Sequence, residues 1–369
     1  MDQIKNNLKS PNLPCDFIKV TQGQPINALM RARKQEYDAP AVDFYTQDRS
    51  FGCGSNRDIL VKLPPGHKFS ESPKKTLGFL LYEFQESQSQ DIDFTLKEYR
   101  EFCKLSNSTK ARTKIQKDLE LLSQAALIWE GSIPNVNPKT GKRSKPSDPT
   151  RYSVEIIKSG SCVFPQSPSE ALYQISFSDE FYKMLNAWGF MYVPASLFQF
   201  SLKRYPYLFA LGWSLCAHLN MNKKGTECGC LTLESLLDCA GIPTYQEEKS
   251  NQRHYKDQIM DPVITTLLEL RNSCGLAYHY AHKNGTPLSK EEEDQILSLD
   301  YPIQDFIKLK IYFSFPNMPQ HEQSKKSGVA NKKKKSTHSK KQNNNKEGRE
   351  NPLFFSALYN CYFFKNLTP

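Results

Sequence analysis

Cationic side chains gather in the first two turns of one predicted helix, where they could donate hydrogen bonds to phosphates and to the edges of nucleic-acid bases. The helix runs from about Thr109 to Ala126, and apolar residues repeat along one of its faces at about 100° per residue. No acidic residue precedes Asp118 in it. A helix that only had to be soluble would mix acids and bases there. The side chains expected to enter a DNA major groove are Lys110, Arg112, Thr113, Lys114, Gln116 and Lys117.

The surrounding elements would position this helix. Thr95 and Glu98 fit a capping box that starts a preceding helix, and a polar turn separates the two helices. The order of strand, helix, turn, helix and hairpin is typical of a winged helix-turn-helix. Its elements are expected at 91–96 (strand), 95–103 (helix), 104–108 (turn), 109–126 (helix), and 127–133 and 151–158 (hairpin strands), after a first helix at 74–87.

The loop between the two hairpin strands is polar and basic. Residues 134–150 are rich in Pro, Gly and Asn, and Asp148 is the only acidic residue among them. A basic wing of this kind holds the neighbouring DNA backbone, so it adds affinity and salt sensitivity more than sequence choice. The residues expected to do so are Lys139, Lys142, Arg143, Lys145 and Arg151.

The same order of elements is expected again after residue 204, without a matching sequence repeat. Helices are predicted at 204–221, 231–243 and 245–260, and Asp261-Pro262 is expected to restart a helix, since proline is tolerated in a first turn. The second wing, 289–305, has six acidic residues and one lysine, so we expect it to face away from DNA. The candidate DNA contacts of this second domain are Lys249, Arg253, His254 and Lys256.

Length and charge distribution suggest two domains with tails. The chain has 369 residues and a net charge of +10, of which residues 320–350 supply +7 through ten Lys or Arg and three Glu. The predicted class is α+β, with two tandem winged-helix domains and a disordered basic C-terminal tail. The predicted parts are a mobile N-terminal arm (1–50), the two domains (51–165 and 166–318), a Lys-rich tail (319–351) and an aromatic C-terminal segment (352–369).

We expect no secretory signal, because the N-terminal residues lack an apolar stretch, and no membrane span, because no run of apolar residues is long enough. Its ten Cys residues lack the spacing of a disulfide framework, and we therefore expect reduced thiols in a cytoplasmic protein that does not associate with membranes.

No enzymatic motif is found. His279 and His282 are three residues apart and would fall on opposite faces of a strand, so they do not form the metal pair of a nuclease. The chain lacks a Walker A or GxGxxG motif. Cys228 and Cys230 have a spacing that is atypical of zinc sites. We expect no catalytic residue, no metal and no cofactor.

Two passages resemble a known family. They are KKTLGFLLYEF, DIDFTLKEYREFCKL and TKARTKIQKDLELLSQAALI within 74–128, and HYKDQIMDPVITTLLEL at 254–270, where a helix meets a "DP" step. In these residues the chain resembles the tandem winged-helix initiators of bacterial plasmid replication. The resemblance implies binding to repeated origin sequences on double-stranded DNA, self-association through a monomer–dimer switch, and recruitment of the host helicase or its loader. It implies no active site.

We therefore expect a sequence-specific DNA-binding protein that initiates plasmid replication by binding origin repeats and promoting duplex opening. A winged-helix transcriptional regulator would use the same first-domain chemistry. A protein-interaction adaptor with an incidental basic surface is the third hypothesis.

Overall fold

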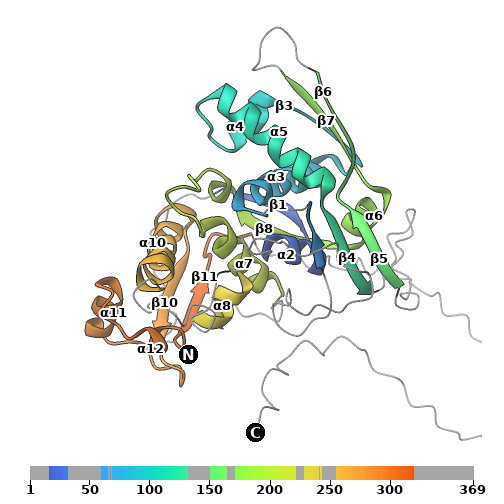
Figure 1. Cartoon of the computed structure of the whole chain (residues 1–369). Coiled ribbons are helices and arrows are strands. Elements are labelled where there is room, and N and C mark those ends of the chain that lie inside the picture. The colour runs from blue at the N-terminus through green and yellow to red at the C-terminus, as the bar shows by residue number, and fades with distance from the viewer. Residues whose placement is uncertain are drawn as a thin grey trace, which may run out of the picture. The chain divides into compact units, whose positions relative to one another are not determined.

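Two groups of helices and strands follow each other in the same order along the chain (Figure 1). The computed structural model describes residues 16–31, 60–64, 67, 69–131, 150–163, 171–221, 228–240, 242 and 255–319. These residues all belong to one compact unit, Met1–Pro319. The tail and the aromatic segment predicted after it lie outside the described residues. None of the helices in the described ranges combines the length and the apolar character needed to span a lipid bilayer.

The first group, here called the first lobe, spans residues 71–177. Its last strand lies in the middle of a three-stranded antiparallel sheet with the order β3-β7-β6. Thr95 caps α4 through the capping box that the sequence predicts. The elements of the lobe's helical face and sheet are α3 (Glu71–Ser87), β3 (Asp91–Thr95), α4 (Leu96–Phe102), α5 (Ser108–Gln124), β6 (Ile157–Val163) and β7 (Leu172–Phe177).

The second lobe, residues 208–314, repeats this order. Its sheet has the order β9-β11-β10, so the last strand is again the central one. Its elements are α7 (Leu208–Met221), β9 (Gly229–Thr232), α8 (Leu233–Cys239), a π-helical turn η4 (Lys256–Met260), α10 (Asp261–Cys274), β10 (Ala277–Ala281) and β11 (Lys310–Ser314). The mixed content agrees with the predicted α+β class, and the predicted return of the element order is found.

The likeness of the two lobes extends to single hydrogen bonds. In the first lobe, Leu96 begins α4, and its backbone N–H donates to Ala171 O at 2.8 Å, just before the central strand. In the second lobe, Leu233 begins α8, and its N–H donates to Leu309 O, also at 2.8 Å and just before the central strand. Each of these helices has a threonine as its N-cap. The two lobes therefore join their second helix to their sheet in the same way.

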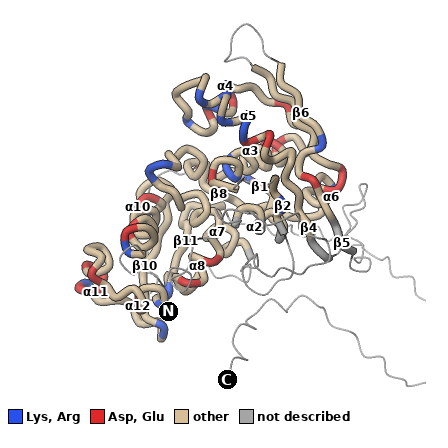
Figure 2. The backbone as a smooth tube through the Cα atoms, viewed as in Figure 1, with Lys and Arg blue, Asp and Glu red and all other residues tan. Residues whose placement is uncertain are grey.

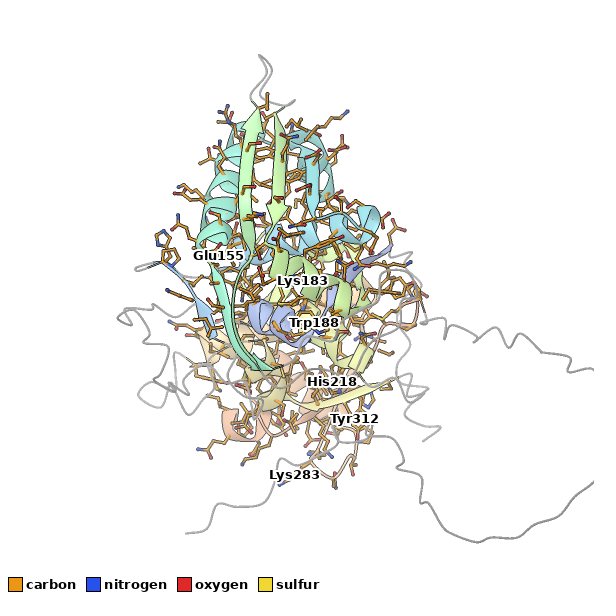
Figure 3. All side chains as sticks on the ribbon, turned by 90° about the vertical axis from the view of Figure 1, so that its right-hand side faces the viewer. Glu155, Lys183, Trp188, His218, Lys283 and Tyr312 are labelled. Carbon is orange, nitrogen blue, oxygen red and sulfur yellow. The ribbon has the colours of Figure 1, made fainter. Side chains whose placement is uncertain are left out.

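A two-stranded ribbon lies between the lobes. β1 (Phe17–Gln22) pairs antiparallel with β8 (Gly189–Pro194), and β1 packs on α3 while β8 packs on α7. Figure 3 shows the first lobe above and the second below, with Trp188, next to β8, between them. α2 (Gln24–Arg31) packs against α7. The expected mobile N-terminal arm is thus wrong for residues 17–31, because their apolar side chains complete this ribbon.

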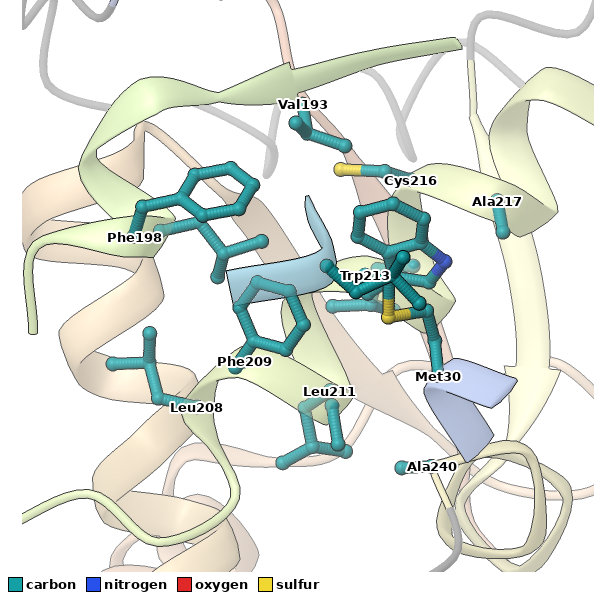
Figure 4. Close-up of a cluster of buried hydrophobic side chains, with 14 of the residues drawn as sticks. Met30, Val193, Phe198, Leu208, Phe209, Leu211, Trp213, Cys216, Ala217 and Ala240 are labelled. Atoms are coloured by element: carbon teal, nitrogen blue, oxygen red, sulfur yellow. The ribbon is translucent and has the colours of Figure 1, made fainter. Parts of the chain in front are cut away.

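Aromatic side chains fill the core where the lobes meet (Figure 4). Phe198 and Phe209 pack edge to face at 5.3 Å, and Trp213 donates from its indole N–H to Asn27 Oδ1 at 3.2 Å. Gly78 on α3 faces them, and a Cβ at this position would lie 2.5 Å from Phe198 Cε1. Close approach of α3 to this cluster therefore depends on a glycine.

The hairpin predicted at 127–133 and 151–158 forms, but in a different sheet. β4 (Ala126–Gly131) pairs with β5 (Thr150–Glu155) and with β2 (Leu60–Lys62), and none of the three pairs with β3. After β5 the chain passes directly into β6. The predicted domain boundary after residue 165 falls between β6 and β7, which pair with each other. A helix, α6 (Asp179–Ala187), follows β7 and is capped by Ser178.

α10 begins at Asp261 with Pro262 in its first turn, as predicted, but it continues from η4 without the expected break. Met260 and Asp261 both have right-handed helical backbone angles, and the N–H of Asp261 bonds to Lys256 O, one residue further back than in an α-helix. This wider turn accommodates a proline that lacks an N–H. Pro262 cannot donate a hydrogen bond to the carbonyl of Gln258, four residues before it. This carbonyl accepts instead from the hydroxyl of Tyr207 at 3.3 Å.

The acidic segment 289–305 is largely helical. It contains α11 (Lys290–Leu297), which Ser289 and Glu292 open as a capping box, and α12 (Ile303–Phe306). The segment predicted as the second wing thus contains two helices, and the acids in the first turn of α11 stabilise its N-terminus. Between β8 and α7 lies the short helix η3 (Ala195–Phe198).

Candidate nucleic-acid interface

The helix α5 carries the predicted cationic side chains on its outer side. Asn107 caps it by accepting from the Lys110 N–H at 2.8 Å, and Ala111, Ile115 and Leu122 are buried on its inner side. The helix ends at Gln124, after which the backbone becomes extended into β4. Its burial thus follows the helical spacing predicted from the sequence.

Asp118 fixes how α5 is rotated against α3. Its carboxylate is only 6% exposed and accepts hydrogen bonds from Ser72 Oγ at 2.7 and 2.9 Å and from Thr76 Oγ1 at 2.7 Å. Thr76 Oγ1 is also 2.9 Å from the hydroxyl of Tyr99 on α4. Burial raises the pKa of the Asp118 carboxyl, and the two hydroxyl donors oppose that rise. The first acidic residue of the helix therefore points inward, which the sequence did not indicate.

With that acid turned inward, the lysines remain on the outer side. Lys110 and Lys117 are exposed and Lys114 is partly buried. None of the ion pairs formed between described residues includes Lys110, Lys114 or Lys117. The three line a groove between α5 and the start of α3 together with Ser70 and Pro73. Figure 2 shows the basic positions along α4 and α5 at one end of the first lobe.

Two predicted polar residues lie on the outermost line of the helix. Thr113 and Gln116 are both exposed, and the Thr113 hydroxyl donates to Thr109 O at 3.1 Å. Arg112 lies on the side of the helix that faces β6 and β7, because its positive charge acts on the Cys162 thiol and on the Tyr173 hydroxyl. Burial raises the pKa of both groups, and the charge of Arg112 partly opposes this rise. The face thus has lysines along one side, uncharged polar residues in the middle, and an arginine along the other side.

The predicted wing does not lie in the sheet that accompanies α5. Arg151 belongs to β5, where its backbone is in register with Glu130, and Lys139, Lys142, Arg143 and Lys145 lie outside the described residues. The hairpin that runs beside α5 is formed by β6 and β7 (Figure 1). The sequence pattern identified the strands, but pairing depends on contacts between distant segments. β4 and β5, which flank the predicted wing, therefore pair in a different sheet from β6 and β7, and the loop between them lies outside the described residues.

The second-lobe candidates are described only in part. Lys249, Arg253 and His254 lie outside the described residues. Lys256 begins the π-helical turn, and its amino group donates to Leu299 O at 2.7 Å. The exposed charged residue next to it is Asp257. The structure therefore brings together the candidates on α5, and Lys256 is the one second-lobe candidate within the described residues.

The residues considered for metal binding are used in other ways. His279 stacks on Tyr312 with ring centroids 5.1 Å apart, and His282 Nε2 lies 3.3 Å from a carboxylate oxygen of Glu292. Cys228 and Cys230 are free thiols, and no group of three or more potential ligands converges within the described ranges.

Comparisons with known proteins found little. No family model matches the chain, and no curated protein matches it. Two crystal structures of RctB are similar in part. That of selenomethionine derivatives of domains 2 and 3 of RctB has 10% sequence identity and a TM-score of 0.41, covering 79% of this chain and 98% of that one. That of RctB domains 2–3, residues 155–483, has 9% identity and a TM-score of 0.36, covering 85% and 96%. Likeness this weak supports no inference about what the chain does.

Proposed function

We propose that the chain is a non-enzymatic, sequence-specific protein that binds double-stranded DNA through a winged helix in its first lobe. The observation that carries this proposal is the outer face of α5, where Lys110, Lys114 and Lys117 project without ion pairs among the described residues. Asp118, on the same helix, is turned inward to α3. Such a cationic face complements the negative charge of phosphate.

In this proposal α5 lies in the major groove, which admits a single α-helix. Lys110, Lys114 and Lys117 contact phosphates along one side of the groove, and Arg112 contacts the other side. Thr113 and Gln116 face the base edges. The hairpin of β6 and β7 takes the place of the wing, because β7 is the central strand of the lobe's sheet.

The second lobe has the same topology, and we propose that it too is a winged helix. The helical segment equivalent to α5 has exposed acids at Asp257 and Asp261 in its described part. Its DNA contacts would therefore come from Lys249, Arg253 and His254, towards an adjacent half-turn of the duplex. Otherwise this lobe would contact a second copy of the chain.

For the biological role we propose initiation of plasmid replication. The chain would bind repeated sequences at an origin, open nearby A·T-rich duplex and recruit a host helicase or its loader. The support is the sequence resemblance to tandem winged-helix initiators, together with two lobes of equal topology and unequal surface charge. A transcriptional regulator would share the first-lobe interface.

The test of DNA binding is the double variant Lys114→Ala/Lys117→Ala. Loss of two phosphate contacts should reduce the slope of log affinity against log salt concentration by about 1.8, at about 0.9 per contact. The matched control is Lys183→Ala/Lys308→Ala, which removes two exposed lysines that sit beside acids of their own helical turns. Equal slopes for both double variants would refute the proposed interface.

The test of the replication role is plasmid maintenance. A circular DNA that carries the coding region and its flanking repeats, but no other origin, should be maintained with the unaltered chain and lost with the Lys114→Ala/Lys117→Ala variant. Binding to the repeats without maintenance would favour the transcriptional regulator.

A further inference from the structure

A buried ammonium group lies beneath the basic face of α5. Lys75 on α3 is 2% exposed, and its Nζ donates to Phe200 O at 2.9 Å. Phe200 belongs to the connector that leads from η3 to α7, so the bond joins the first lobe to the start of the second. No ion pair between described residues includes Lys75. Its acceptor is a backbone carbonyl, which compensates a buried charge only weakly.

Four titratable groups face Lys75 from the elements packed around it. Glu71 on α3 and Asp118 on α5 favour its charged form, as does the thiol of Cys103 after α4, whereas Lys114 on α5 opposes it. Both carboxylates are already bound to other donors. Asp118 accepts from the two α3 hydroxyls, and Glu71 accepts from the Lys74 amino group and from a backbone N–H of α7.

The same turn of α3 also holds the second lobe directly. Glu71 Oε2 accepts from the Ala210 N–H at 3.1 Å, in the first turn of α7. Glu71 and Lys75 are one helical turn apart on α3, so they share a side of that helix. Through them α3 contacts α7 and the connector, while Ser72 and Thr76 on its other side contact α5. α3 is therefore the element through which the DNA-facing helix can act on the junction between the lobes.

We propose that Lys75 couples phosphate binding at Lys114 to the contact between the first lobe and the connector, so that DNA binding strengthens the bond from Lys75 Nζ to Phe200 O. This inference rests on the proposed function. The physical reason is charge balance. A phosphate at Lys114 offsets the positive charge that opposes the ammonium of Lys75, and the ammonium form, which donates the stronger hydrogen bond, is stabilised.

The sign of the coupling follows from the protonation of Lys75. Burial, as the largest cause, lowers the pKa of Lys75 from 10.5 to about 8, and the charge of Lys114 lowers it further, against the opposing effect of Cys103 and the two carboxylates. Binding of a phosphate at Lys114 would raise this pKa. The bound state then holds more protons than the free state near pH 8, so affinity for DNA decreases as the pH rises through that value.

The experiment measures DNA affinity by fluorescence anisotropy with the full chain, from about pH 7 to about pH 9 at constant ionic strength. The probe is a short labelled duplex selected from a random pool for the tightest binding. The unaltered chain should lose about threefold more affinity across this range than Lys75→Arg, whose charge does not titrate, since each unit of pKa shift corresponds to a tenfold change. Lys183→Arg, on the exposed surface of α6, is the matched control and should behave as the unaltered chain does.

A second measurement separates coupling from a structural effect of the substitutions. Backbone hydrogen exchange in 195–200 should slow when DNA binds to the unaltered chain, and Lys75→Met should abolish that change while still folding, as judged by its denaturation midpoint. If the duplex binds with the lysine-dependent salt slope but the pH profiles of the unaltered chain and Lys75→Arg coincide, the coupling is wrong and the proposed function stands. If no duplex binds at any pH, the proposed function fails and the coupling fails with it.

Discussion

Replacing Asp118 is the sharpest test of how the DNA-facing helix is held. In Asp118→Ala, the hydroxyls of Ser72 and Thr76 lose their acceptor in a part of the lobe where Thr76 is fully buried. Hydrogen bonds to a charged group contribute about 1.5–3 kcal/mol each, so two donors give about 3–6 kcal/mol. Part of this loss in the free energy of unfolding is offset, because the substitution also removes a buried charge. Burial disfavours the ionised form of Asp118, as the raised pKa of its carboxyl shows. We expect a net loss of about 2–4 kcal/mol.

Two matched variants define the origin of that loss. Asp118→Asn retains one acceptor oxygen and should cost about 1–2 kcal/mol. Glu120→Ala removes an exposed acid from the same helix and should stay within about 0.5 kcal/mol of the unaltered chain. The assay is urea denaturation at neutral pH, followed by circular dichroism. Equal midpoints for Asp118→Ala and Glu120→Ala would show that Asp118 does not anchor α5 to α3.

Three further predictions concern the lobes and their junction. Thr95→Ala and Thr232→Ala should each cost about 1 kcal/mol in chemical denaturation, because both remove the N-cap of the second helix of a lobe; a cost at only one site would show that the caps are not equivalent. Gly78→Ala should destabilise by about 1–3 kcal/mol despite the better helix propensity of alanine, because the new Cβ would meet Phe198; a stabilised variant in thermal unfolding would contradict this. The free energy of unfolding should rise more steeply from about pH 8 to about 10.5 in the unaltered chain than in Lys75→Met, since the folded state lowers the pKa of Lys75 and binds its proton less tightly than the unfolded chain; parallel stability–pH curves would disprove it.

Local signals in the sequence predicted helix ends well. The capping box of Thr95 and Glu98 starts α4 as predicted, because such a cap depends on residues within one turn of each other. The buried face of α5 also followed from its helical spacing. Each of these features is decided by near neighbours in the chain, so a pattern of residues contains the information.

Pairing between distant segments was not predictable in the same way. β4 has the residue pattern of a strand, but this pattern does not show that β4 pairs with β2, or that β3 pairs with β7. β8 pairs with β1, which lies far from it in the chain, and no local pattern of residues shows such a partner. The helix break expected at Pro262 is absent for a related reason. The π-helical turn accommodates the proline, and the hydroxyl of Tyr207, from a distant part of the chain, donates to the carbonyl that the proline leaves without a helical N–H donor.

The sequence by itself determined which helix is basic, that α4 begins after the Thr95 cap, and that one order of elements occurs twice. These features depend on residue type and short spacing, which a folded environment does not change. Only the tertiary structure decided that Asp118 turns inward, that Lys75 is buried against the connector, and that the β6–β7 hairpin accompanies α5. Burial and hydrogen bonding between segments far apart in the chain set the direction of a charged side chain, and its own position in the sequence does not contain that information.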